Sequence, residues 1–137
     1  LPRSMKSKIS IITLGVKDVK ASAEFYKKLG FEVDGEEGDH VMFKTEWTRF
    51  ALFPADKLAE DADLTADQFG SGRSNFTLAR NEPSKEAVNK TIEEARSIGA
   101  TILKEPQDVF WGGYSGYFED PDGFLWEVTF NPFQDLS

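Results

Sequence analysis

The sequence contains no cysteine and a single histidine, His40. The lack of cysteine excludes thiol catalysis, a disulfide scaffold and every zinc site built on cysteine. With one histidine, the chain also cannot form a metal centre that needs two histidines from one molecule. These two shortages limit the chemistry before any motif is considered.

Positive charge and long apolar runs are scarce as well. The 137 residues include 16 Lys and Arg against 24 Asp and Glu, which gives a formal net charge of −8. An acidic chain without a basic block is a poor candidate for binding nucleic acid or an anionic membrane. No apolar run approaches the ~18 residues of a membrane span. We therefore expect no nucleic-acid partner, no membrane partner and a cytoplasmic location.

The first half of the sequence predicts a strand, a helix and three further strands. Residues 8–16 are β-branched and apolar, as in a strand. Asp18 then fits a helix N-cap, apolar residues follow at helical spacing, and Gly30 fits the position after the last turn. Further strands are predicted at 31–33, 40–44 and 48–53. The acidic stretch 54–72 is interpreted as a surface connection with room for a short helix.

The second half repeats this pattern. Residues 74–78 match residues 10–14 at an offset of 64, and the following helix matches at an offset of 69. Further strands are predicted at 101–103, 113–119 and 124–130. The sequence Asp-Pro-Asp-Gly at 120–123 joins the last two, with proline and glycine where a type I turn favours them.

The predicted fold is therefore α+β, with two tandem βαβββ units that form a curved mixed β-sheet cleft with the helices outside. A chain of this length supports one domain, and neither unit has enough core to stand alone. We place unit one at 8–69 and unit two at 70–132. The remaining parts are a lead at 1–7, interpreted as a tag remnant, and a tail at 133–137.

This pattern resembles the vicinal oxygen chelate superfamily, which includes glyoxalase I, bleomycin and fosfomycin resistance proteins and extradiol dioxygenases. The similarity covers residues 9–132 and is carried by ITLGVKDVKASAEFYKKLGFE (12–32) and GYFEDPDGFLWEVTFNP (116–132). The branch of glyoxalase-like and bleomycin-resistance-like proteins is the most similar. The resemblance implies the fold but not the function, because this fold hosts many chemistries.

Family enzymes usually hold one divalent metal with ligands from equivalent strands of the two units. The resemblance places these positions at Ile11, Ala51, Asn75 and Glu127, of which only Glu127 matches the family's ligand. A transition-metal site normally needs about three His or carboxylate ligands. We therefore predict no cofactor and no resident metal, with a divalent metal in a reorganised site as the alternative.

Strand alternation predicts which side chains line the cleft. The candidate catalytic residues are Glu127 and Tyr117, the latter resembling the pocket tyrosine of fosfomycin resistance proteins. The candidate ligand-binding residues are Trp47, Arg49, Phe53, Asn75, Trp111 and Tyr117, with Tyr114 as a further wall. Arg49 either clamps a ligand anion or forms an internal ion pair with Glu127. The aromatic residues expected in the core are Phe25, Tyr26, Phe50, Phe76, Phe118 and Trp126.

Three functions remain open. The first is a metal-independent protein that binds a small organic molecule in the cleft, and the second is a metal-dependent lyase, isomerase or dioxygenase. The third is metal-free acid–base catalysis by Glu127 with Tyr117 or Arg49 as oxyanion partner. The resemblance also implies a homodimer, sometimes with units exchanged between chains.

Overall fold

The two halves of the chain form the same arrangement of strands and helix. The structure, a computed structural model, describes residues 7–72 and 75–137. The first half contains β1 (Ile11–Val16), α1 (Val19–Leu29), β2 (Glu32–Glu37), β3 (His40–Lys44) and β4 (Arg49–Pro54), followed by α2 (Ala55–Asp61) and α3 (Ala66–Phe69). The second contains β5 (Leu78–Asn81), α4 (Lys85–Ser97), β6 (Thr101–Asp108), β7 (Tyr114–Glu119) and β8 (Leu125–Phe130).

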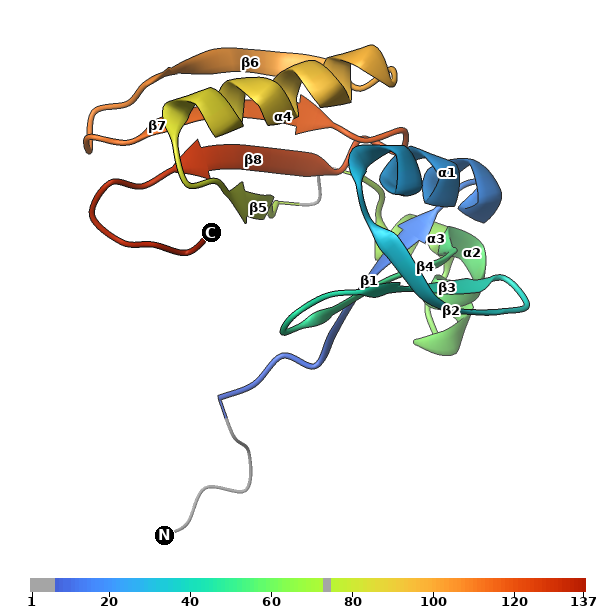
Figure 1. The fold of residues 1–137 in the computed structure, drawn as a ribbon. Helices are drawn as coiled ribbons and strands as arrows, with labels where there is room; N and C mark the ends of the chain where they lie inside the picture. Colours follow the sequence, from blue (N-terminus) through green and yellow to red (C-terminus); the bar gives the residue numbers. More distant parts are fainter. Residues whose placement is uncertain (1–6, 73–74) are drawn as a thin grey trace, which may run out of the picture.

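Each half builds one open four-stranded sheet (Figure 1). The order is β1-β4-β3-β2 in sheet 1 and β5-β8-β7-β6 in sheet 2. In both sheets the first strand pairs with the last in parallel, and the other pairs are antiparallel. This confirms the predicted α+β class and the tandem βαβββ topology.

The first strand of unit two is shifted along the sequence. The match to residues 10–14 predicts it at 74–78, whereas β5 begins only at Leu78. Ser74 lies outside the described residues. Asn75 has a positive φ of 63°, a left-handed conformation that does not continue a strand. The shift keeps Leu78 beside Trp126 and Ala79 beside Glu127, so apolar Leu78 faces the core.

Helix α1 begins and ends where the sequence predicts. The Asp18 carboxylate accepts a hydrogen bond from the Ala21 N–H at 3.0 Å, as an N-cap does. Gly30 closes the helix with φ 113°, a left-handed conformation that costs glycine little. In the acidic connection the structure contains the two short helices α2 and α3.

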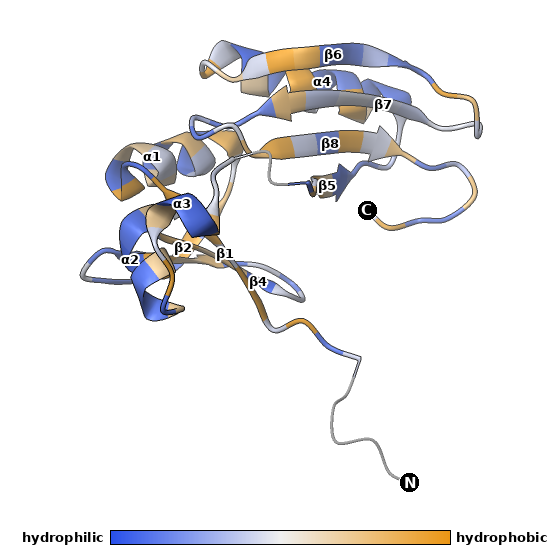
Figure 2. Cartoon of the chain, turned by 180° about the vertical axis from the view of Figure 1, so that it is seen from behind, coloured by the Kyte–Doolittle hydropathy of each residue, from blue (hydrophilic) through white to orange (hydrophobic). Residues whose placement is uncertain are grey.

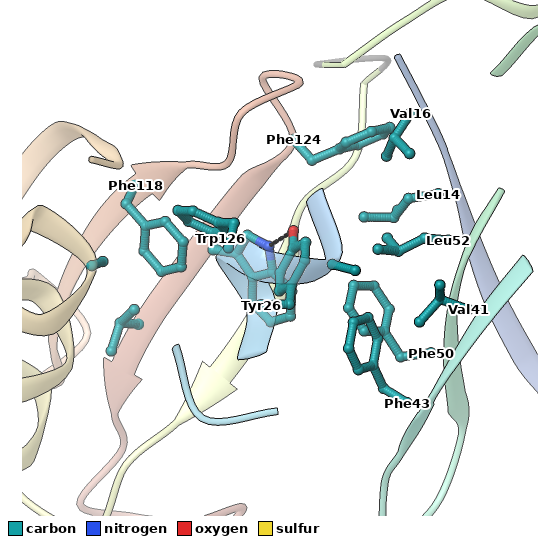
Figure 3. Close-up of a cluster of buried hydrophobic side chains, with 14 of the residues drawn as sticks. Leu14, Val16, Tyr26, Val41, Phe43, Phe50, Leu52, Phe118, Phe124 and Trp126 are labelled. Atoms are coloured by element: carbon teal, nitrogen blue, oxygen red, sulfur yellow. Dashed lines mark hydrogen bonds between the residues drawn. The ribbon is translucent and has the colours of Figure 1, made fainter. Parts of the chain in front are cut away.

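The core is built around Tyr26, which is fully buried on α1 (Figure 3). Its ring lies 5.1 Å from that of Phe50 in sheet 1 and 6.0 Å from that of Trp126 in sheet 2. One side chain of α1 thus contacts aromatic residues from both sheets. Burial of such rings removes a large apolar area from water and stabilises the packing of α1 on both sheets.

Five of the six aromatic residues expected in the core are buried, and Phe76 is the exception. Phe76 is 43% exposed, although its ring packs against that of Phe124 with the ring centres 6.1 Å apart. The expectation placed Phe76 inside a strand. It was wrong because the residue precedes β5, where no sheet alternation turns it inward.

Polar groups join the two units at the same place. The Tyr26 hydroxyl donates a hydrogen bond of 2.6 Å to the Asp120 carboxylate and accepts one of 3.0 Å from the Trp126 indole N–H. Asp120 begins the predicted turn, which the Gly123 N–H closes by donating to the Asp120 carbonyl. Asp122 of the same turn accepts from the backbone N–H of Lys17 at 2.8 Å. The turn of unit two is therefore docked on α1 of unit one.

Burial controls the ionisation of this network. It raises the pKa of Asp120 above its ordinary value and that of Tyr26 well above its own, with the neighbouring carboxylate adding to the effect on Tyr26. The folded protein therefore holds the Asp120 proton more tightly than the unfolded chain does. The contribution of Asp120 to the free energy of unfolding consequently falls as pH rises from about 3.8 through the raised pKa.

No helix in the described ranges 7–72 and 75–137 combines the length and the apolar character needed to cross a membrane.

We predict that Tyr26→Phe lowers the free energy of unfolding by about 1–3 kcal/mol, because it removes the buried partner of the Asp120 Oδ2 atom and of the Trp126 indole N–H. Urea unfolding measures this change. Tyr114→Phe is the matched control, since its hydroxyl bonds Asn89 at the surface. Equal stability of Tyr26→Phe and the unmodified protein would show that the buried network does not hold the two sheets together.

Candidate functional site

Glu127 and Tyr117 lie side by side on sheet 2. They are directly opposite each other in the antiparallel pair of β8 and β7. Their alternate neighbours Phe118, Trp126 and Val128 are buried on the face that α4 covers. Glu127 and Tyr117 therefore occupy the opposite face, where both side chains are partly exposed. Figure 2 shows the corresponding alternation of hydrophobic and hydrophilic segments along β8.

The two side chains interact directly. Partial burial raises the pKa of the Tyr117 phenol above its ordinary value of 10.0, and the charge of Glu127 and a hydrogen bond to it raise it further. The phenol thus stays protonated in the neutral range and can donate to the carboxylate. This pair can present a negative charge of fixed orientation to a molecule on the open face.

Two hydroxyl groups extend this polar surface toward the end of β8. Thr129 follows Glu127 by two residues, and Ser115 precedes Tyr117 by two, so all four side chains share one face. Ser115 and Thr129 are paired across the strands and are buried, with 3% and 5% exposure. The sequence analysis did not include them among the ligand-binding residues. The alternation that places Glu127 inward was the signal that could have identified both.

Arg49 does not pair with Glu127 in the structure. Its guanidinium donates a hydrogen bond of 2.9 Å to the carboxylate of Asp34, on the outer strand of the same sheet. The predicted internal Arg49–Glu127 pair is therefore wrong. Asp34 lies at the irregularity of β2 between Val33 and Gly35, within reach of Arg49 across β3.

The other candidate residues are dispersed. Trp47 is 88% exposed and lines, with Arg49 and residues 7–10, a groove of about 590 Å³. Phe53 packs against His40 with ring centres 6.0 Å apart. Asn75 is exposed and lies before β5.

Among these residues, Trp111 lies nearest to the Ser115 end of the polar surface formed by Glu127, Tyr117, Ser115 and Thr129. Its ring packs so closely on Gly113 that a β-carbon there would be 2.0 Å from it. Gly113 directly precedes β7, two residues before Ser115. Tyr114 faces the other way, where its hydroxyl donates to Asn89 of α4 at 2.6 Å.

The side chains around Glu127 do not fit the family's metal. Its neighbours in the register are Ala79 on β5 and Tyr117 on β7. In sheet 1 the corresponding position is Ala51, between Thr13 and Met42. The part of the chain that the structure describes holds no group of three or more His, Asp or Glu that could bind a metal ion. One carboxylate beside a methyl group and a phenol is too few donors for a transition metal.

The sequence of the chain matches a known family over most of its length. Residues 8–128 match the Glyoxalase/Bleomycin resistance protein/Dioxygenase superfamily. The chain belongs to this superfamily. The resemblance found in the two motifs is thereby confirmed, and the fold described above is the glyoxalase-like one.

Solved structures show the same fold. A glyoxalase-related enzyme from Fulvimarina pelagi is 27% identical with a TM-score of 0.89, over 96% of this chain and 94% of that one. A superfamily enzyme from Burkholderia phytofirmans is 21% identical with a TM-score of 0.81, over 90% and 98% of the two chains. A lactoylglutathione lyase from Agrobacterium tumefaciens is 22% identical with a TM-score of 0.74, over 97% and 100%. The last two show likeness of fold alone. No curated protein matches the chain.

We predict that Glu127→Gln lowers the pKa of Tyr117, because the substitution removes the negative charge that opposes phenolate formation. NMR of tyrosine-labelled protein follows each phenol between pH 8 and about 12. Since the folded pKa is raised, the stabilisation by Tyr117 is present below about pH 10 and is lost as pH rises through the folded value. An unchanged Tyr117 titration in the variant would show that the two side chains do not interact.

Proposed function

We propose that the protein binds a small organic molecule on the open face of sheet 2, around Glu127 and Tyr117, without the superfamily's metal. The observation that carries this proposal is the isolated position of Glu127. The Glu127 side chain lies on the face that α4 leaves open. Its neighbours on the adjacent strands are the methyl group of Ala79 and the phenol of Tyr117. Such a surface can bind a ligand by hydrogen bonds and aromatic contact.

The charge of the site supports ligand binding over an internal structural role. Arg49 is engaged by Asp34, so it does not neutralise Glu127. Tyr117, opposite Glu127 on the neighbouring strand, offers a neutral phenol and adds no positive charge. A ligand with hydrogen-bond donors would supply the charged partner that the Glu127 carboxylate lacks among the described residues of the sheet.

A second copy of the chain covers the edge of sheet 1 in this proposal. The outer strands β1 and β5 each leave one edge unpaired in the described chain. Large apolar side chains are exposed close to the β1 edge, namely Ile9, Ile11 and Trp47. Burying them against a partner would be favourable by about 25 cal/mol for each Å² of apolar surface removed from water. We therefore propose a homodimer whose partner covers this region.

We predict that the purified protein carries less than one transition-metal ion per chain and that adding Mn²⁺, Ni²⁺ or Zn²⁺ leaves its melting temperature unchanged. Metal bound at a native site would stabilise the folded state by mass action. Elemental analysis and thermal melts measure both quantities, with Glu127→Gln beside Glu60→Gln of α2 as the control. Stoichiometric metal that is lost in Glu127→Gln alone would overturn the proposal and favour a metal-dependent lyase or dioxygenase.

We also predict a dimer in light scattering coupled to size exclusion. Trp47→Glu should shift it toward the monomer, because it places a charge where apolar contact is expected. Phe110→Glu is the control, since Phe110 is fully exposed on the β6–β7 loop of the other unit. A monomer at all concentrations would contradict the proposed partner.

A further inference from the structure

The open face of sheet 2 is unevenly covered along β7 and β8. Glu127 and Tyr117 are partly exposed, whereas Thr129 and Ser115, one step further along the same face, are almost completely buried. The row of polar side chains therefore runs from an accessible carboxylate to two shielded hydroxyls. Among the residues of this unit that the structure describes, no helix covers that face, since α4 packs against the other one.

The Thr129 hydroxyl makes no hydrogen bond with any residue in the described ranges. Buried polar groups in native proteins are almost always paired, and leaving one unpaired is unfavourable. Ser115 lies directly across the strand from Thr129 and is buried as well. An unpaired hydroxyl beside a candidate binding surface indicates that its partner comes from outside the chain.

Trp111 closes this end of the row. Its ring lies on Gly113, and by strand alternation Gly113 shares the face of Ser115. Two glycines follow Trp111, and Gly112 has a positive φ of 99°. A side chain on such a segment can change its position at a smaller backbone cost than one within a strand. In the proposal below, Trp111 moves off Gly113 and packs against the bound molecule.

Charge indicates the kind of group that Glu127 would bind. Among the described residues no Lys, Arg or His forms an ion pair with it. The chain as a whole carries a formal charge of −8, which favours the approach of cations. An ammonium group satisfies a carboxylate that has only a phenol as its neighbour.

We propose that the ligand is an arylalkylamine with a second polar group, whose ammonium binds Glu127 and whose hydroxyl binds Thr129 beneath Trp111. Residues two apart on a strand are separated by about 7 Å, which sets the spacing between the two polar groups. The aromatic body then lies between Tyr117 and Trp111. This inference rests on the proposed function and adds the ligand class and the role of Thr129.

The test uses two probe molecules, para-hydroxybenzylamine and benzylamine, which differ only in the hydroxyl group. Ligand-observed NMR titrations give their dissociation constants with the unmodified protein, Thr129→Val and the control Thr91→Val on the buried side of α4. We expect para-hydroxybenzylamine to bind about fivefold more tightly than benzylamine. Thr129→Val should abolish that difference without weakening benzylamine, and Thr91→Val should preserve it.

Three results would overturn the inference. Equal affinities of the two amines for the unmodified protein, or equal weakening of both by Thr129→Val, would remove the assigned role of Thr129 and leave the proposed function standing. Failure of both amines to bind would reject the ligand class, whereas the proposed function is judged separately by the metal analysis of Glu127→Gln.

Stability provides a second and independent measurement. Valine has the shape of threonine without the hydroxyl, so Thr129→Val should leave the urea midpoint unchanged or raise it, because an unpaired buried hydroxyl is removed. A marked fall of the midpoint would show that the hydroxyl is paired within the protein, and the inference would be wrong.

Discussion

The hydroxyl of Tyr26 holds the two halves of the molecule together. It lies on the helix of unit one, while both of its hydrogen-bond partners, Asp120 and Trp126, belong to unit two. Its ring packs between Phe50 and Trp126, so apolar burial and hydrogen bonding act at one point (Figure 3). Because β8 begins just after the turn that Asp120 anchors, this contact also fixes where the candidate site lies.

The contact between Tyr26 and Trp126 fixes the direction of every side chain on β8. Trp126 faces α1, so Glu127 must face the opposite side, with Thr129 two residues further on. The same face of β7 provides Tyr117 and Ser115. A strand that packs its apolar residues against the core thus presents an ordered row of polar groups on its other side, and the row ends under Trp111.

The sequence predicts the architecture well because its signals are local. Asp18, Gly30 and the turn at 120–123 mark the ends of elements by their own backbone preferences. Relations between distant strands are harder to predict. The repeat offset placed Asn75 in a strand that actually starts at Leu78, and nothing local revealed that Asp34 binds Arg49 across β3. The burial of Thr129 depends on neighbours from other strands, so it could be recognised only in the structure.

The central claim is that the face around Glu127 binds small molecules without a metal. The most direct measurement is a map of backbone amide NMR shifts during titration with a library of small fragments in the presence of EDTA. The account predicts shifts concentrated at Ala79, Tyr117 and Glu127, which are neighbours across three strands. Shifts there that occur only after Mn²⁺ or Zn²⁺ replaces EDTA, or shifts confined to sheet 1, would contradict it.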